Sequence, residues 1–301
     1  MPLKQDLDPP FEIKGDEKVK DRITAMINTA VKSETGRETL ETASKAGYTL
    51  GMEFAFGCNG GCSKENKVII LNPIEKDETL IGVLVHESRH AGQFERGEYD
   101  ACDDRRARTN TLKHNIMRTR AVEADAQATA AQALGELFEA GIEEPLLSFC
   151  RQPANRTIAA AFNRACYAPD ALKDGSARTA AFLGWYDNEA VRTAYDNVYQ
   201  IDMMERRAEN GKNIEDTYAT TQSGAKIVKD LCVKADGSCY FTEDPKILET
   251  QDYAGTTPAV ATKLDTLMKA VPNARKSAEN VQPFKAEDNR AFMMKKMRIG
   301  R

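Results

Sequence analysis

The chain has 301 residues, of which 41% are hydrophobic and 29% charged, and its mean hydropathy is -0.54. Its 46 acidic and 42 basic residues give a formal charge of -4, which argues against the basic excess of nucleic-acid-binding proteins. No apolar run approaches the roughly 20 residues of a membrane span, and the polar N-terminus has no signal-peptide core. We therefore expect a cytoplasmic protein without nucleic-acid or membrane partners, and leave open export without an N-terminal signal.

The N-terminal third of the chain alternates between helical and strand-like patterns. Apolar residues recur with helical spacing over 16–33, and a second short helix is predicted over 37–46. The segments 48–56 and 67–71 are rich in β-branched and aromatic residues and predict two strands. The sequence GCNGGCSKEN between them predicts a loop, and helical spacing returns over 79–94.

The middle of the chain is predicted to be helical. A long helix is expected over about 105–140, followed by helices at 144–151, 157–167 and 179–210. These patterns together predict an α+β fold that is mostly helical, with a small β-sheet packed beside the helix at 79–94.

Composition divides the chain into three predicted parts. An N-terminal helical segment, 1–47, precedes a central domain over 48–210. The region 211–301 is polar, with a hairpin signal at Asp236-Gly237 and a basic tail. The role of this last region is left open.

The cysteines do not form a complete disulfide framework, because there are seven of them. Cys58 and Cys62 flank an NGG turn, and Cys232 and Cys239 flank the hairpin signal, so either pair is close enough along the chain to be bridged. We expect reduced thiols, as is usual in the cytosol.

The segment LVHESRHAGQ places His86 and His90 one helical turn apart, and the chain has only three histidines. Side chains at i and i+4 of a helix point the same way, so both imidazoles can reach one Zn²⁺ ion. Glu87 projects about 100° away, where a carboxylate can take a proton from a zinc-bound water. A solvated helical face is the alternative, but a chance HExxH has an expectation on the order of 10⁻³ in such a composition.

A catalytic zinc ion usually has three protein ligands and one open position. Projection of the predicted long helix at about 100° per residue places Glu123 within an apolar stripe, and His114 and Asp125 on the opposite, surface side. The stripe consists of Leu112, Ile116, Ala130, Leu134 and Leu137. A carboxylate there needs compensation, which a metal ion or a salt bridge to Arg120 would provide. We predict Glu123 as the third ligand of one Zn²⁺ per chain.

LVHESRHAGQ and the later RAVEADAQA resemble the gluzincin metallopeptidases, in which HExxH and a distal glutamate bind zinc. More narrowly, they are similar to an uncharacterised bacterial metallopeptidase family with the patterns HExRHxxQ and EADAxA. The resemblance covers about residues 48–137. It implies a zincin-like domain that hydrolyses protein or peptide substrates, with His86, His90 and Glu123 on the zinc and Glu87 as general base.

One position departs from the gluzincin pattern. Many gluzincins carry an aspartate four residues after the ligand glutamate, where it orients a histidine ligand. Here that position is Gln127, whose carbonyl is a weaker acceptor, and the aspartate is Asp125 at the second position. Asp125 therefore stays open as an alternative to Glu123.

The leading functional hypothesis is a zinc metallopeptidase in which the strand at 67–71 aligns an extended substrate. Stabilisation of the transition state is unassigned; the candidates are Tyr186, Tyr195, Tyr199 and Arg120.

The alternative hypothesis is a non-catalytic metal-binding or protein-interaction module on the same scaffold. In it a thiolate of Cys58, Cys62 or Cys102 fills the fourth metal position. Substrate specificity and oligomeric state have no signal in the sequence.

Overall fold

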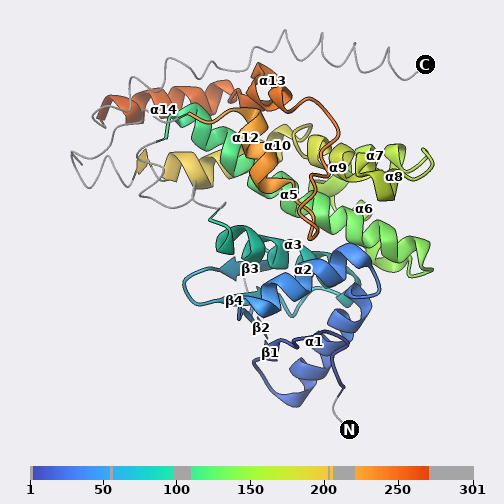
Figure 1. The fold of residues 1–301 in the computed structure, drawn as a ribbon. Coiled ribbons are helices and arrows are strands. Elements are labelled where there is room, and N and C mark those ends of the chain that lie inside the picture. Colours follow the sequence, from blue (N-terminus) through green and yellow to red (C-terminus); the bar gives the residue numbers. More distant parts are fainter. Residues whose placement is uncertain (1–2, 55–56, 98–109, 203, 206–220, 271–301) are drawn as a thin grey trace. The chain divides into compact units, whose positions relative to one another are not determined.

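A computed structural model describes residues 3–54, 57–97, 110–202, 204–205 and 221–270 (Figure 1). Over these residues the protein is mostly helical with one small mixed sheet, so the predicted α+β class is confirmed.

The chain forms two compact units, each built from three stretches of sequence. Unit 1 comprises Met1–Tyr99, Val122–Asp187 and Lys229–Glu243. Unit 2 comprises Asp100–Ala121, Asn188–Val228 and Asp244–Arg301. The domain boundaries inferred from composition, at residues 47 and 210, stay a prediction.

The sheet of unit 1 has the strand order β1-β2-β4-β3. Its strands are β1 (Glu12–Ile13), β2 (Thr49–Met52), β3 (Gly60–Ser63) and β4 (Val68–Leu71). β1, β2 and β4 are parallel, whereas β3 pairs antiparallel with β4. The two predicted strands are confirmed as β2 and β4, with β2 shorter than expected.

Two expectations about the sheet are wrong. The segment GCNGGCSKEN is not only a loop, because it contains β3. Gly60 can lie in this strand because it has no side chain: a Cβ there would come 2.6 Å from Cγ1 of Val83. β4 is paired with β2 on one side and β3 on the other, so it has no free edge to align a substrate.

Three helices of unit 1 match the predicted ones (Figure 1). They are α1 (Glu17–Ala30), α2 (Glu34–Lys45) and α3 (Asp77–Glu95). The side chains of Asp16 and Ser33 accept hydrogen bonds from the first turns of α1 and α2, which fixes where these helices begin. α1 packs against β2 of the sheet, and α3 packs against α1, α2, β3 and β4.

The long helix α5 (Leu112–Glu139) has its first ten residues in unit 2 and the rest in unit 1. Its predicted apolar stripe is buried, but so is almost every other position between residues 112 and 137. The prediction that His114 and Asp125 lie at the surface is therefore wrong; they are 2% and 0% exposed. A helical projection that predicts one buried stripe assumes that the helix packs on one face only, whereas α5 is buried on nearly all of its faces. Residues 105–109 lie outside the described residues.

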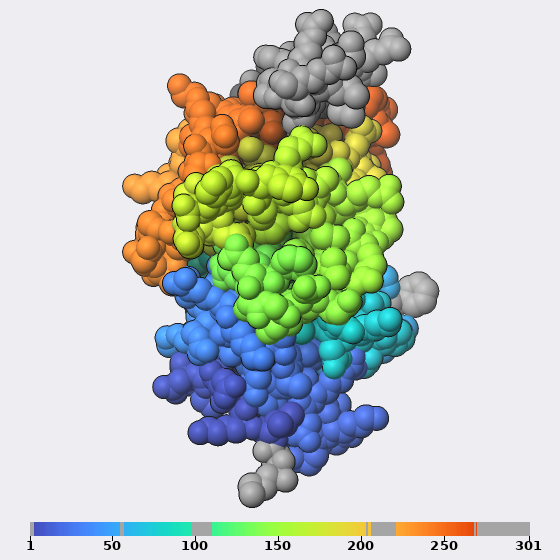
Figure 2. Space-filling view, turned by 90° about the vertical axis from the view of Figure 1, so that its right-hand side faces the viewer, coloured from blue at the N-terminus to red at the C-terminus, as the bar shows by residue number. Residues whose placement is uncertain are grey.

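Further helices of unit 1 follow α5, and the predicted helices at 144–151 and 157–167 are confirmed. They are α6 (Glu144–Arg151), the 3-10 turn η1 (Pro153–Asn155), α7 (Arg156–Ala165), α8 (Ala171–Asp174) and α9 (Ser176–Trp185). Figure 2 shows the outer surface of α6 to α8 in green to yellow-green, while their inner faces bury Leu146, Phe149, Ile158 and Phe162.

The prediction of one helix over 179–210 is wrong. α9 ends at Trp185 and α10 (Glu189–Asp196) begins anew, because the side chain of Asn188 accepts a hydrogen bond from the backbone N–H of Val191 and caps α10. This break coincides with the change from unit 1 to unit 2. Residues 206–210 lie outside the described residues.

Unit 2 has its own apolar core and a buried ion pair. Its other elements are a π-helical turn η2 (Asn197–Ile201), most of α12 (Gly224–Leu231), η3 (Pro245–Glu249), α13 (Gln251–Ala254) and α14 (Pro258–Ala270). Its core contains Leu112, Ile116, Ile201, Met204, Val260 and Leu264. The guanidinium of Arg120 bonds both carboxylate oxygens of Asp196 and the carbonyls of Tyr253 and Gly255.

The predicted hairpin at Asp236-Gly237 is confirmed and belongs to unit 1. Val233 and Cys239 form an antiparallel bridge, and Gly237 has a φ of +83°, which glycine adopts without strain. The basic C-terminal tail lies outside the described residues.

The two glycines of β3 provide a matched test of this packing. Gly60→Ala should lower the free energy of unfolding by about 1–3 kcal/mol, because the new Cβ overlaps Val83 and lies 2.9 Å from the carbonyl oxygen of Ile70. Gly61→Ala, whose Cβ would meet nothing within 4 Å, should change it by less than about 0.5 kcal/mol. Urea denaturation measures both values; equal values would contradict the close approach of β3 to α3.

Candidate metal centre

The structure brings His86, His90 and Glu123 together in unit 1. The two histidines lie one turn apart on α3, and Glu123 reaches them from α5. All three are buried, with exposed fractions of 9%, 4% and 2%.

Their ligand atoms converge on one point. Nε2 of His86 and Nε2 of His90 are 3.0 Å apart. Oε2 of Glu123 lies 3.7 Å from the first and 3.4 Å from the second. Donor atoms about 2.0–2.1 Å from a tetrahedral zinc ion lie about 3.3 Å from one another. The group could therefore hold a metal ion of this kind.

No fourth Cys, His, Asp or Glu joins this group among the residues that the structure describes. Cys58 is exposed and Cys62 half-buried, both as free thiols, and neither belongs to the group. Cys102 lies outside the described residues. Over the described part of the chain, three protein ligands leave a metal with an open position, as in catalytic zinc sites.

The two imidazoles differ in their affinity for a proton. Burial, and then the neighbouring His90, lowers the pKa of His86 to about 3. Burial also opposes a charge on His90, but Glu123, by its charge and a hydrogen bond, outweighs this and the pKa of His90 rises to about 9. The two Nε2 atoms lie within hydrogen-bonding distance of each other, so one proton can lie between them, and a metal cation would take its place.

Glu87 lies beside this group, between α3 and β3. It is 8% exposed, and burial, reinforced by Glu123 and opposed by His90, raises its pKa to about 7. A Cβ on Gly60 would lie 3.5 Å from Cγ of Glu87, so the edge strand runs directly past this carboxylate. A buried carboxyl group with a raised pKa is suited to accept and return a proton near neutral pH.

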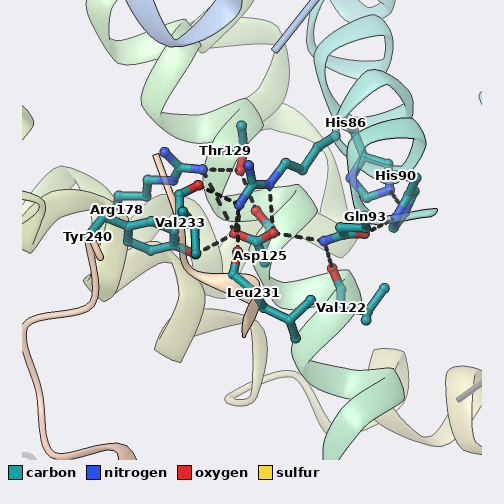
Figure 3. Close-up of polar contacts among 11 residues, drawn as sticks. His86, His90, Gln93, Val122, Asp125, Thr129, Arg178, Leu231, Val233 and Tyr240 are labelled. Atoms are coloured by element: carbon teal, nitrogen blue, oxygen red, sulfur yellow. Dashed lines mark hydrogen bonds and ion pairs between the residues drawn. The ribbon is translucent and has the colours of Figure 1, made fainter. Parts of the chain in front are cut away.

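Behind His90 lies a network of buried hydrogen bonds centred on Asp125 (Figure 3). Gln93 lies between His90 and Asp125: its amide oxygen is 2.7 Å from Nδ1 of His90, and its amide nitrogen is 2.8 Å from Asp125. Arg89 binds both carboxylate oxygens of Asp125, at 2.7 and 3.0 Å. Burial would raise the pKa of Asp125, but Arg89 outweighs it and the pKa is lowered.

The same network reaches the hairpin. The hydroxyl of Tyr240 donates to Asp125 at 2.7 Å, and Arg89 donates to the carbonyls of Leu231 and Val233 at 2.6 and 3.0 Å. Arg178 lies over the ring of Tyr240, 3.9 Å from its centre.

Asp125 is thus not part of the convergent group, and the alternative that it replaces Glu123 has no geometric support. Gln127, considered as the residue that orients a histidine, is half-buried and makes none of these hydrogen bonds. The side chain that contacts Nδ1 of His90 is instead that of Gln93, three residues after His90.

Sequence reasoning missed the contribution of Arg89, Gln93 and Tyr240. Arg89 and Gln93 do stand at the R and Q of the pattern HExRHxxQ, so the resemblance carried a signal for both. Tyr240 is 115 residues from Asp125, and no local pattern connects them.

The tyrosines proposed for transition-state stabilisation have other contacts. The ring of Tyr186 packs with those of Phe182 and Trp185 in the core of unit 1. Tyr195 and Tyr199 stack on each other in unit 2. Arg120, also in unit 2, forms a buried ion pair with Asp196.

Residues 3–242 match the model of the Putative metallopeptidase family (DUF6782). The chain belongs to this family. The matched residues include the whole convergent group, Glu87 and the network as far as Tyr240, and membership suggests a hydrolase. Comparison with curated proteins and with solved structures gave no match. None of the described helices is long and apolar enough to cross a membrane.

Zinc should stabilise the metal-free protein if the group binds it. At a free concentration of 100 times Kd, Zn²⁺ should raise the free energy of unfolding by about 2.7 kcal/mol. Glu123→Gln should reduce this gain sharply, whereas Glu95→Gln, which removes a half-exposed carboxylate from α3, the helix of the two histidines, should keep it. Urea denaturation with and without Zn²⁺ measures the gain; the same gain in both variants would exclude Glu123 as a ligand.

Proposed function

We propose that the protein is a zinc-dependent metallopeptidase that hydrolyses peptide bonds in protein or peptide substrates. His86, His90 and Glu123 hold one Zn²⁺ per chain, and Glu87 is the general base. The proposal rests on one observation above all: three buried donor atoms converge at the spacing of a tetrahedral site, with a buried carboxylate beside them. Membership of a metallopeptidase family supports it.

The zinc ion and Glu87 have different roles in the proposed hydrolysis. A zinc ion held by His86, His90 and Glu123 would lower the pKa of a bound water and polarise a carbonyl oxygen. The carboxylate of Glu87 would accept a proton from the attacking water and return it to the nitrogen of the leaving amine. Glu87 is 8% exposed and lies beside β3, and this burial limits its contact with bulk water, which strengthens these electrostatic interactions.

The substrate is aligned by β3 rather than by β4. Among the described strands β3 pairs with β4 alone, so its other edge can add an extended peptide as a further strand. Because Gly60 lies against Glu87, a peptide on this edge would pass close to the general base. Gly61 has open space where a Cβ would be, so its side of the strand leaves room for substrate side chains.

Glu87→Gln tests the mechanism. The variant should retain zinc, because Glu87 is not a ligand, and should lose about 10²–10⁴-fold in turnover, because the general base is gone. Zinc content by elemental mass spectrometry and turnover of a mixture of internally quenched peptides measure the two effects. Glu95→Gln is the matched control and should keep both. Full turnover in Glu87→Gln would contradict the mechanism.

A further inference from the structure

Asp125 is fully buried and does not belong to the metal group, yet donors from separate segments hold its carboxylate. Arg89 and Gln93 reach it from α3, and Tyr240 reaches it from the hairpin. An oxygen of Asp125 also lies 3.8 Å from the guanidinium of Arg178. The direction of this carboxylate is therefore fixed from several sides, as it must be for a buried charge to be tolerated.

The carboxylate determines which way the amide of Gln93 points. The amide nitrogen lies 3.0 Å from the carbonyl oxygen of Val122 and 2.8 Å from Asp125. Both partners are acceptors only, so the two N–H groups of Gln93 must point to them. The amide oxygen is then the atom that faces His90.

The amide oxygen in turn determines the tautomer of His90. It lies 2.7 Å from Nδ1 of His90 and can only accept, so Nδ1 must carry a hydrogen. In a neutral imidazole Nε2 is then unprotonated, with its lone pair directed at the point where His86 and Glu123 converge. In contrast, Nδ1 of His86 is buried without a hydrogen-bond partner among the described residues.

The hairpin is held in place by contacts that are independent of Asp125. The hydroxyl of Thr179 donates to the carbonyl oxygen of Tyr240, and the backbone of Tyr240 donates to that of Cys232. The family match ends at residue 242, directly after this hairpin.

We propose that Asp125, Gln93 and Tyr240 are positioning residues of the metal centre, which fix His90 with Nε2 toward the ion, and that the hairpin over residues 231–240 is part of that centre. This inference rests on the proposed zinc site. It assigns a role to a segment that lies more than a hundred residues from the HExxH helix.

The test measures zinc affinity and the state of the histidine rings in the full-length chain. Gln93→Leu should weaken zinc binding about 10–100-fold, measured by competition with a chelator. In zinc-loaded protein with ¹⁵N-labelled histidine, it should also remove the hydrogen-bonded Nδ1–H signal of His90 and leave the ring nitrogen signals of His86 unchanged. Only three histidines contribute to this spectrum.

Gln132→Leu is the matched control. Gln132 is a buried glutamine on α5 that donates to Glu136 and to the carbonyl of Leu172. Gln132→Leu therefore removes a buried amide of the same kind at a site that makes no hydrogen bond to His90. Both zinc affinity and the His90 signal should stay as in the wild type.

Tyr240→Phe removes only the hydroxyl that donates to Asp125 and keeps the ring, so it provides a second test of the inference if Gln93→Leu does not fold. It should weaken zinc binding less than Gln93→Leu does. Thr179→Val removes one hydrogen bond to the hairpin backbone but leaves the hydroxyl of Tyr240 on Asp125, so it should weaken zinc binding less than Tyr240→Phe does. Wild-type affinity in both Gln93→Leu and Tyr240→Phe would overturn the inference while leaving the zinc site intact. A wild type that binds no zinc would overturn the proposed function as well.

Discussion

Two acidic residues lie two positions apart in the interior of unit 1, and the arrangement around them follows from the need to compensate a carboxylate at each position. Glu123 and Asp125 are 2% and 0% exposed on α5. An unpaired carboxylate in such a place is very costly. α3 supplies the partners in one short segment: His86 and His90 face Glu123, and Arg89 binds Asp125 with two hydrogen bonds. The packing of α3 against α5 thus depends on the same side chains that form the metal group.

The parts of this site that were predictable from the sequence are those governed by spacing within one helix. His86, Glu87 and His90 follow from the i, i+1 and i+4 geometry, and Glu123 follows from its position in an apolar stripe. Asp125 was misplaced because α5 is enclosed by other segments, which a projection of one helix cannot reveal. The glycines of β3 predict a loop because they are common in turns, whereas the missing side chain of Gly60 is what allows the strand to approach α3. The contact of Tyr240 with Asp125 arises only from the tertiary fold.

The position of β3 in the sheet supports the proposed catalytic function. Among the described strands, β3 is at the edge of the sheet and also runs past Glu87, whereas β4 is paired on both sides. On the opposite side of the histidines, the network from Gln93 to the hairpin holds one imidazole in a defined orientation (Figure 3). His86, His90 and Glu123 thus lie between β3, which we propose as the substrate-binding edge, and the hydrogen-bond network around Asp125. Both are contained in the part of the chain that matches the family.

X-ray absorption spectroscopy of the zinc-loaded protein tests the central claim most directly, because it reports the atoms bound to the ion. We predict two imidazole nitrogens and oxygen ligands at about 2.0–2.1 Å, with the oxygens from Glu123 and a water. A sulfur at about 2.3 Å would show that a cysteine completes the shell, and would contradict the open site on which the proposed hydrolysis depends.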